Sequence, residues 1–163
     1  MKLRDFIVTD AVVPNLKATD RDGAIRELVE SLVGGGALPA DAVDEVVAAL
    51  IKREQNGSTG FGKGVAVPHV KHPQVKKMAG TIGRSEAGVD FAALDHQPVY
   101  SVVLLLSPAP PDEGEKTRAN QHHLQAMNVI FNNLQKDMFR RFLRQSATRE
   151  AICELLDEAD QGK

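Results

Sequence analysis

The pattern of hydrophobic and polar residues divides the chain into helices and strands. Apolar residues three and four positions apart indicate amphipathic helices, whereas short continuous apolar runs indicate buried strands. The helices expected on this basis cover residues 22–33, 41–55, 120–134 and 148–158. The expected strands cover residues 11–16, 65–67, 78–84 and 99–106. Residues 112–118 are dense in charge and are expected to form a mobile loop, and residues 137–144 a short segment between the last two helices.

The run from Val99 to Leu106 is the strongest strand signal, because six of its eight residues are Val or Leu. Such a continuous apolar run is typical of a strand that is buried on both faces. The segment 11–16 is expected at a sheet edge, since Pro14 cannot donate a ladder hydrogen bond. The element order β-α-α-β-β-β-α-α predicts an α/β fold, with a single mixed β-sheet and helices packed on both faces. A chain of 163 residues is expected to form one domain, residues 1–163.

A glycine-rich segment joins the second expected helix to the strand that follows it. Four glycines fall between Gly57 and Gly64, where backbone N–H groups can converge on an anion. The spacing from Gly57 to Lys63 is that of the start of a Walker A loop. Gly64 stands where that loop needs Ser or Thr for magnesium, and the segment follows a helix rather than a strand. His69 comes next, behind the conformationally restrained Pro68. A histidine beside an anion site suggests chemistry on phosphate.

The whole string resembles the type-2 EIIA domain of the bacterial phosphoenolpyruvate:sugar phosphotransferase system, the fructose/mannitol/nitrogen-regulatory class. The matching residues are Arg53-Glu54, Gly57-Ser58-Thr59-Gly60, Gly62, Gly64 and Val65-Ala66-Val67-Pro68-His69. The chain departs from the pattern at Val70, where the family usually has a small residue, so a shift of alignment between Val70 and Lys77 stays open. The order of the elements extends the resemblance over most of the chain and implies the same α/β sandwich.

The resemblance implies a phosphohistidine carrier without a cofactor or a metal. His69 would accept a phosphoryl group through Nε2 from HPr, the histidine phosphocarrier protein. A guanidinium, hydroxyls and backbone amides are suited to hold the phosphoryl oxygens. The residues expected to do so are Arg53, Gly57, Ser58, Thr59 and Gly60.

The family also has a second histidine in a His-Leu context, which His123-Leu124 matches. His123 shares a helix face with Met127 and Ile130, so it is expected to point inward from the first turn, near the positive end of the helix dipole. His122 lies about 100° further around the helix and is expected to face solvent. The residues alone favour a core histidine bonded to a carbonyl; the resemblance assigns His123 to the site.

Two routes for the phosphoryl group are consistent with the resemblance. A sugar component would pass the group to a cysteine of an EIIB domain, whereas a nitrogen-type component would regulate other proteins. Residues 1–163 include no EIIB or membrane EIIC region, and on this basis we expect the regulatory route. Two alternatives remain: a non-transferring binding module on the same fold, and, with less support, a zinc hydrolase that uses His69, His72 and His123.

Composition excludes several other classes. The 20 basic and 22 acidic residues give a net charge of −2, and the chain has no Trp and one Tyr, so no nucleic-acid surface is expected. No apolar run reaches membrane-spanning length, and the charged start, residues 1–5, is not followed by the long apolar segment of a signal peptide. The single cysteine, Cys153, excludes an internal disulfide and a Cys-based zinc cluster. We therefore expect a cytoplasmic protein that does not insert into the membrane.

Overall fold

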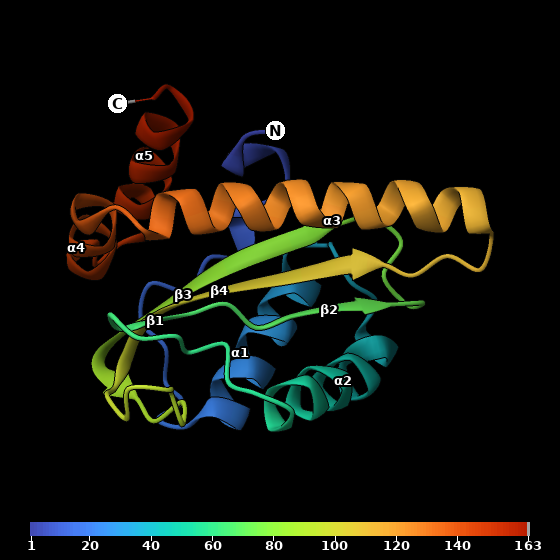
Figure 1. The fold of residues 1–163 in the computed structure, drawn as a ribbon. Coiled ribbons are helices and arrows are strands. Elements are labelled where there is room, and N and C mark those ends of the chain that lie inside the picture. Colours follow the sequence, from blue (N-terminus) through green and yellow to red (C-terminus); the bar gives the residue numbers. More distant parts are fainter. Residues whose placement is uncertain (163) are drawn as a thin grey trace.

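The computed structural model describes residues 1–162, in which helices lie on both sides of a small sheet (Figure 1). The helices are α1 (Arg21–Gly34), α2 (Val43–Gln55), α3 (Glu113–Leu134), α4 (Asp137–Gln145) and α5 (Arg149–Asp160). The strands are β1 (Val65–Ala66), β2 (His69–His72), β3 (Ala79–Val89) and β4 (Val99–Pro108). Short 3-10 helices span Leu3–Asp5, Thr9–Ala11 and Ala40–Ala42.

Strand β4 is the centre of the sheet. The strands β1 and β2 follow one another along one side of β4 and run parallel to it, while β3 pairs antiparallel on the other side. His69 is in register with Leu105 across the β2–β4 pair, and Ile82 is in register with Val103 across β3–β4. The mixed sheet predicted from the order of elements is confirmed.

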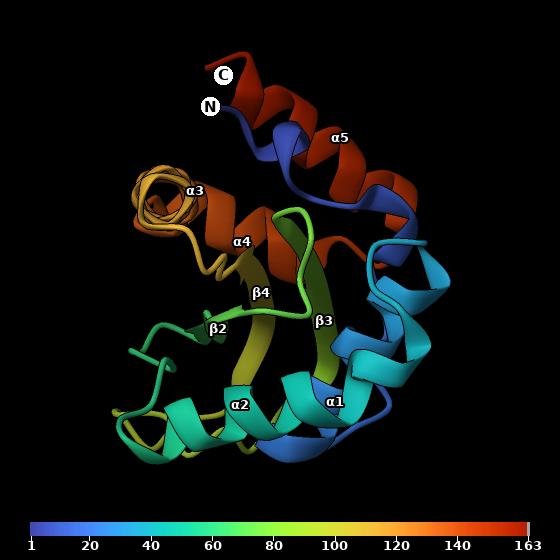
Figure 2. The ribbon, with the colours of Figure 1, turned by 90° about the vertical axis from the view of Figure 1, so that its right-hand side faces the viewer.

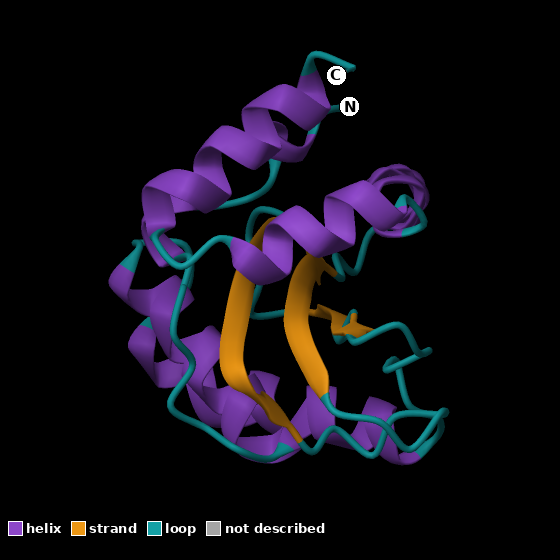
Figure 3. Ribbon diagram, turned by 90° about the vertical axis from the view of Figure 1, so that its left-hand side faces the viewer, coloured by secondary structure: helices purple, strands orange, loops and turns teal. Residues whose placement is uncertain are grey.

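The side chains of β4 alternate between two hydrophobic layers, as a strand buried on both faces requires. Val102 and Leu104 belong to the layer formed with α1 and α2. Val103 and Leu105 belong to the layer formed with α3, α4 and α5. Figure 3 shows helices on either side of the strands. This arrangement confirms the strand predicted between Val99 and Leu106. Among the described residues, no helix combines the length and the apolarity needed to cross a bilayer.

The largest error in the predicted elements lies at the start of α3. Residues 112–118 are not a loop, because the helix begins at Glu113. Asp112 caps it by accepting a hydrogen bond from the Glu115 amide at 3.0 Å, and the acidic Glu113 and Glu115 lie in the first turn, where the helix dipole favours negative charge. These first turns are exposed, so they carry no apolar period by which the sequence could have revealed them.

Two predictions about strands are also corrected. Residues 11–16 form no regular strand: a 3-10 helix occupies Thr9–Ala11, and Val13 makes an isolated bridge to Gly83 at the edge of β3. Beyond the bridge the pairing is irregular, since the next hydrogen bond to β3 comes from the Leu16 amide, which donates to the Arg84 carbonyl at 2.8 Å. The short strand β2 was missed, since only one of its four residues is apolar.

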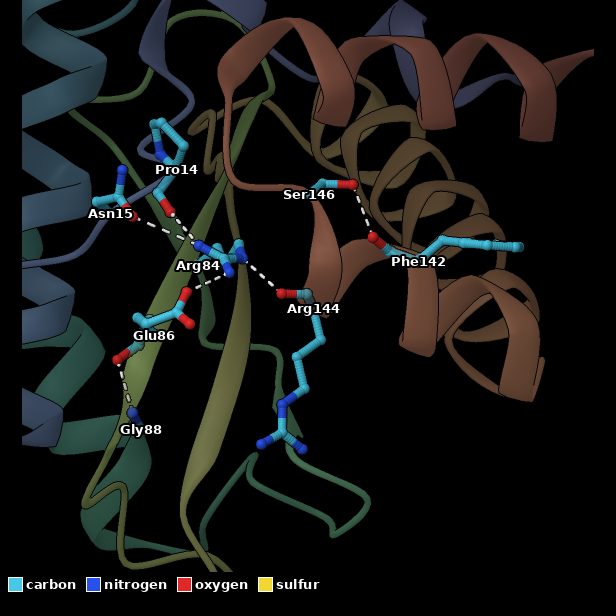
Figure 4. A network of polar contacts seen from close by, with 9 residues as sticks. Pro14, Asn15, Arg84, Glu86, Gly88, Phe142, Arg144 and Ser146 are labelled. Atoms are coloured by element: carbon cyan, nitrogen blue, oxygen red, sulfur yellow. Dashed lines mark hydrogen bonds and ion pairs between the residues drawn. The ribbon is translucent and has the colours of Figure 1, made fainter.

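The buried side chain of Arg84 joins three parts of the fold (Figure 4). Its guanidinium donates hydrogen bonds to the backbone carbonyl of Arg144 in α4 and to that of Pro14 in the N-terminal segment. It also forms an ion pair with Glu86 on β3. These contacts hold α4 against β3, at the end of the sheet where β1 and the glycine-rich loop lie.

The two ends of the described chain lie side by side (Figure 2). Asp160, near the end of α5, accepts hydrogen bonds from the backbone amides of Leu3 and Arg4 at 2.7 and 3.0 Å. Arg4 also forms a salt bridge with Asp157. A single carboxylate on the last helix therefore anchors the first turn of the chain.

Candidate functional site

His69 is placed by the backbone on both sides of it. Pro68 ends the link from β1, and its carbonyl accepts a hydrogen bond from the Leu105 amide of β4 at 3.0 Å. The Nδ1 atom of His69 lies 2.7 Å from the Val67 carbonyl oxygen. A carbonyl can only accept, so Nδ1 must carry the proton of the neutral ring. Nε2 is left with its lone pair, which makes it the nucleophilic nitrogen.

His123 lies beside His69, with the ring centroids 5.6 Å apart and the planes tilted by 42°. It comes from α3 and is 6% exposed. Its Nδ1 makes a 2.6 Å hydrogen bond with the hydroxyl of Ser107 on β4. The predicted position in the first turn is wrong, because α3 begins ten residues earlier, so the helix dipole contributes little here. His122 is exposed, as its position on the helix predicted.

Both histidines favour the neutral ring. Burial lowers the pKa of His123 to about 4, and the charges of His69 and Lys71 act in the same direction. Burial also lowers the pKa of His69; the positive charge of Arg53 adds to this effect and the Val67 carbonyl opposes it. Near pH 7 the site therefore holds two uncharged imidazoles, and the lone pair of His69 is not lost to a proton.

Glu54 organises the glycine-rich loop from the end of α2. Its carboxylate is 3% exposed and accepts hydrogen bonds from both the amide, at 2.9 Å, and the hydroxyl of Thr59. The Thr59 carbonyl in turn accepts from the Val67 amide at 3.3 Å, which ties the loop to the segment before His69. Glu54 was part of the Arg-Glu motif, yet its role was not predicted, because nothing local in the sequence says that this carboxylate is buried.

Most of the expected phosphate-binding groups of the loop are already engaged. The amides of Gly57 and Gly60 donate to the Glu54 carbonyl and to the Ser58 hydroxyl oxygen, at 3.1 and 3.0 Å. The Thr59 hydroxyl donates to Glu54. The Ser58 hydroxyl only accepts in these contacts, so its proton is free to donate to an anion. A Cβ at Gly60 would lie 2.9 Å from that of Ala93, which explains glycine there by close packing.

Arg53 lies in the last turn of α2 with an exposed side chain. One guanidinium nitrogen, Nη1, donates to the Gly57 carbonyl at 3.0 Å, which directs the group along the loop. Its charge is close enough to His69 to lower the pKa of that ring. The remaining N–H groups of the fork are available for an anion bound at His69.

The third histidine of the suggested zinc site belongs to a turn. The Nδ1 atom of His72, at the end of β2, accepts a hydrogen bond from the Gln74 amide at 3.1 Å. Within residues 1–162, no group of three or more His, Cys, Asp or Glu side chains is placed to hold a metal ion.

The lowered pKa of His123 predicts that the protein loses stability in mild acid. Below pH 6.5 the unfolded chain binds a proton at this ring that the folded chain does not, so the free energy of unfolding falls as the pH falls. The shift from 6.5 to about 4 corresponds to a loss of about 3 kcal/mol by pH 4. Urea unfolding at pH 7, 6, 5 and 4 measures it, with His123→Asn as the variant that cannot titrate. The expectation is wrong if wild type and His123→Asn lose stability in parallel, and His122→Asn, at an exposed position, should behave as wild type.

Comparison with known proteins gives a consistent result. The family model described as "Phosphoenolpyruvate-dependent sugar phosphotransferase system, EIIA 2" matches residues 5–159. A nitrogen regulatory protein of Bradyrhizobium diazoefficiens is 35% identical over 156 residues, which are 96% of this chain and 95% of that protein. The fructose-specific EIIABC component of Bacillus subtilis is 30% identical over 162 residues, 99% of this chain; the chain spans only 24% of that longer protein.

Solved structures have the same fold. The nitrogen regulatory protein IIA-Ntr from Neisseria meningitidis superimposes with a TM-score of 0.78 and 26% identity, over 93% of this chain and 97% of that one. Enzyme IIAMTL, solved in complex with phosphorylated enzyme IIBMTL from Escherichia coli, gives a TM-score of 0.72 at 22% identity, over 91% and 95% of the two chains. The family match over nearly the whole chain, together with these relatives, shows that this protein belongs to the type-2 EIIA family of the phosphoenolpyruvate-dependent phosphotransferase system.

Proposed function

We propose that this protein is a reversible phosphohistidine carrier, in which His69 accepts a phosphoryl group from HPr and later gives it up. The observation that carries the proposal is the hydrogen bond from His69 Nδ1 to the Val67 carbonyl. It fixes the ring with the lone pair on Nε2, next to a second neutral imidazole and within electrostatic reach of Arg53.

The bonds that break and form in the transfer involve only two imidazole rings, that of the phosphorylated histidine of HPr and that of His69. The bond between phosphorus and nitrogen in the phosphorylated histidine of HPr breaks, and its electron pair returns to the HPr ring. The Nε2 lone pair of His69 forms the new phosphorus–nitrogen bond. The ring gains positive character while its proton stays on Nδ1, and the hydrogen bond that Nδ1 donates to the Val67 carbonyl stabilises that charge. The reverse sequence, with a different acceptor, unloads the carrier.

The neighbouring groups would stabilise the charge on the transferred phosphoryl group. Catalysis of such a transfer consists mostly of positioning and electrostatic stabilisation. Arg53 would donate to the phosphoryl oxygens with the N–H groups that Gly57 does not use, and the Ser58 hydroxyl would donate from the loop. Glu54 would act one step away, by holding Thr59 and with it the conformation of the loop. We propose that Gly57, Thr59 and Gly60 contribute by maintaining the conformation of this loop.

The downstream partner is proposed to be a regulatory target or an EIIB domain. The nitrogen-regulatory relative is covered almost from end to end by this chain, which favours the regulatory route. The complex of a fold relative with its phosphorylated IIB partner supports the EIIB class as an acceptor. We propose that residues 1–163 act as a single EIIA domain, since the family model spans nearly all of them.

A reconstituted phosphorylation assay tests the proposal. The protein is mixed with phosphoenolpyruvate, enzyme I and HPr, and its intact mass is measured. We expect a gain of one phosphoryl group that depends on HPr and is lost in acid, as the phosphorus–nitrogen bond of a phosphohistidine requires. No mass gain would support the non-transferring binding module instead. A gain that survives acid would place the group on a hydroxyl and overturn the assignment to histidine.

A further inference from the structure

We propose that Ser107 is a positioning residue, which fixes His123 in the tautomer that carries its proton on Nε2. The ring would then offer an N–H donor to the phosphoryl group on His69. This inference rests on the proposed function of the site and adds a residue that neither the sequence pattern nor the family resemblance pointed out.

Ser107 is set by the geometry of the central strand. It lies near the end of β4, in register with Lys71 of β2, and its side chain is fully buried. Side chains two residues apart share a face of a strand. Ser107 therefore follows Val103 and Leu105 on the face that packs against α3, where its hydroxyl meets His123 at 2.6 Å. It is a polar residue at the end of a continuous apolar run, at the point where the run reaches the site.

The direction of this hydrogen bond follows from what each partner can do. A neutral imidazole has one N–H and one acceptor nitrogen, whereas a hydroxyl can donate or accept. His123 Nδ1 is the hydrogen-bond partner found for the Ser107 hydroxyl among the described residues. If Nδ1 donated instead, the buried hydroxyl proton would have no acceptor, and an unsatisfied buried donor is unfavourable. The favoured arrangement has Ser107 donating and Nδ1 accepting, which leaves the proton of His123 on Nε2.

The two rings of the site then have opposite tautomers with complementary roles. His69 keeps its proton on Nδ1, against the Val67 carbonyl, and has a free lone pair on Nε2. His123 keeps its lone pair on Nδ1, against Ser107, and has an N–H on Nε2. A lone pair at that Nε2 would repel the oxygens of a phosphoryl group on His69, whereas an N–H attracts them. The tautomer of His123 therefore decides whether this ring opposes or supports transfer.

Nitrogen-15 NMR of protein labelled at histidine tests the assignment directly. Long-range couplings between ring protons and nitrogens distinguish a protonated nitrogen from one with a lone pair. At pH 7 we expect Nδ1 of His123 to be unprotonated and Nε2 protonated, and the reverse for His69. A protonated Nδ1 on His123 would overturn the proposal. This readout needs no phosphoryl transfer, so wild-type protein with the expected tautomer but no phosphorylation would refute the proposed function and leave the tautomer assignment in place.

Variants of Ser107 connect the tautomer to the rate. In Ser107→Ala we expect a mixture of His123 tautomers and phosphorylation by HPr that is slower by roughly 10-fold, since one preorganised donor is lost for part of the population. Ser107→Thr, which keeps the hydroxyl, should restore both. Ser101→Ala is the matched control, because Ser101 is buried on the same strand and face without a histidine partner. The proposal fails if Ser107→Ala keeps the wild-type tautomer and rate, or if Ser101→Ala changes them equally.

Discussion

Replacement of His69 by alanine is expected to abolish the phosphoryl gain in the assay with HPr. The variant lacks the ring whose Nδ1 is held by Val67 and whose Nε2 has a free lone pair. His123 is not expected to replace it although its ring is only 5.6 Å away, because its Nδ1 is bound to Ser107 and its Nε2 would carry the proton. Intact mass after the reaction with phosphoenolpyruvate, enzyme I and HPr measures the loss.

The control for this variant is His72→Ala. His72 is the other histidine of β2, and its Nδ1 is engaged with the Gln74 amide in the turn that follows the strand. It should be phosphorylated at the wild-type rate. If His69→Ala gains the phosphoryl group normally, the site is elsewhere. If His72→Ala also loses it, the loss reports damage to β2 rather than removal of the nucleophile.

Replacement of Arg53 by alanine is expected to slow phosphoryl transfer to His69 by about 100-fold, the size typical of removing one charge-stabilising donor. Its single hydrogen bond, to the Gly57 carbonyl, leaves several N–H groups for the phosphoryl oxygens. Arg53→Lys should recover part of the rate, because the charge remains while the two-pronged geometry is lost. A rapid-quench time course of phosphorylation by HPr resolves these differences.

The stability of the Arg53 variants separates catalysis from structure. Arg53 is exposed, so Arg53→Ala should change the free energy of unfolding by less than about 1 kcal/mol. Lys52→Ala removes the adjacent cation of the same helix turn and should phosphorylate at the wild-type rate. A slow Arg53→Ala variant that is also strongly destabilised, or a Lys52→Ala variant that is equally slow, would contradict a direct role for the guanidinium.

The helices that the sequence predicts well are those whose apolar residues recur at the spacing of one buried helix face. Helix α1 was expected at residues 22–33 and is found at Arg21–Gly34, where Asp20 caps it by accepting a hydrogen bond from the Gly23 amide. Helix α2 was expected at residues 41–55 and is found at Val43–Gln55, with apolar side chains of its predicted inner face buried. The start of α3 was predicted wrongly for the opposite reason. Its first turns are exposed, and an N-cap and acidic residues stabilise them rather than burial.

The alignment left open between Val70 and Lys77 concerns a region with a clear structure. Val70 lies on β2 in register with Leu106, and its partly buried side chain packs against the hydrophobic layer formed with α1 and α2. A larger side chain than the family usually has there is therefore accommodated by packing. The strand itself could not be predicted, because pairing with β4 supplies the stabilisation that its own polar sequence lacks.

The candidate site was predictable as a set of residues but not as a set of hydrogen bonds. The motif identified His69, Arg53 and the loop, and the His-Leu context identified His123; their roles remain predictions. The partners that fix their protonation and shape, Ser107 and Glu54, act through contacts between segments far apart in the chain or through burial. Such contacts leave no periodic pattern, so they are found only once the strands and helices are assembled.

The shared anchor of the two chain ends has a practical consequence. Because Asp160 holds the backbone of Leu3 and Arg4, anything attached to either end leaves the molecule from one corner. Figures 1 and 2 both place that corner away from β2, which carries His69. An affinity label, a fluorophore or a fused domain at either end would therefore leave the face that carries His69 accessible to partner proteins. A truncation of α5 that removes Asp160 would also remove the hydrogen bonds that hold the first turn of the chain.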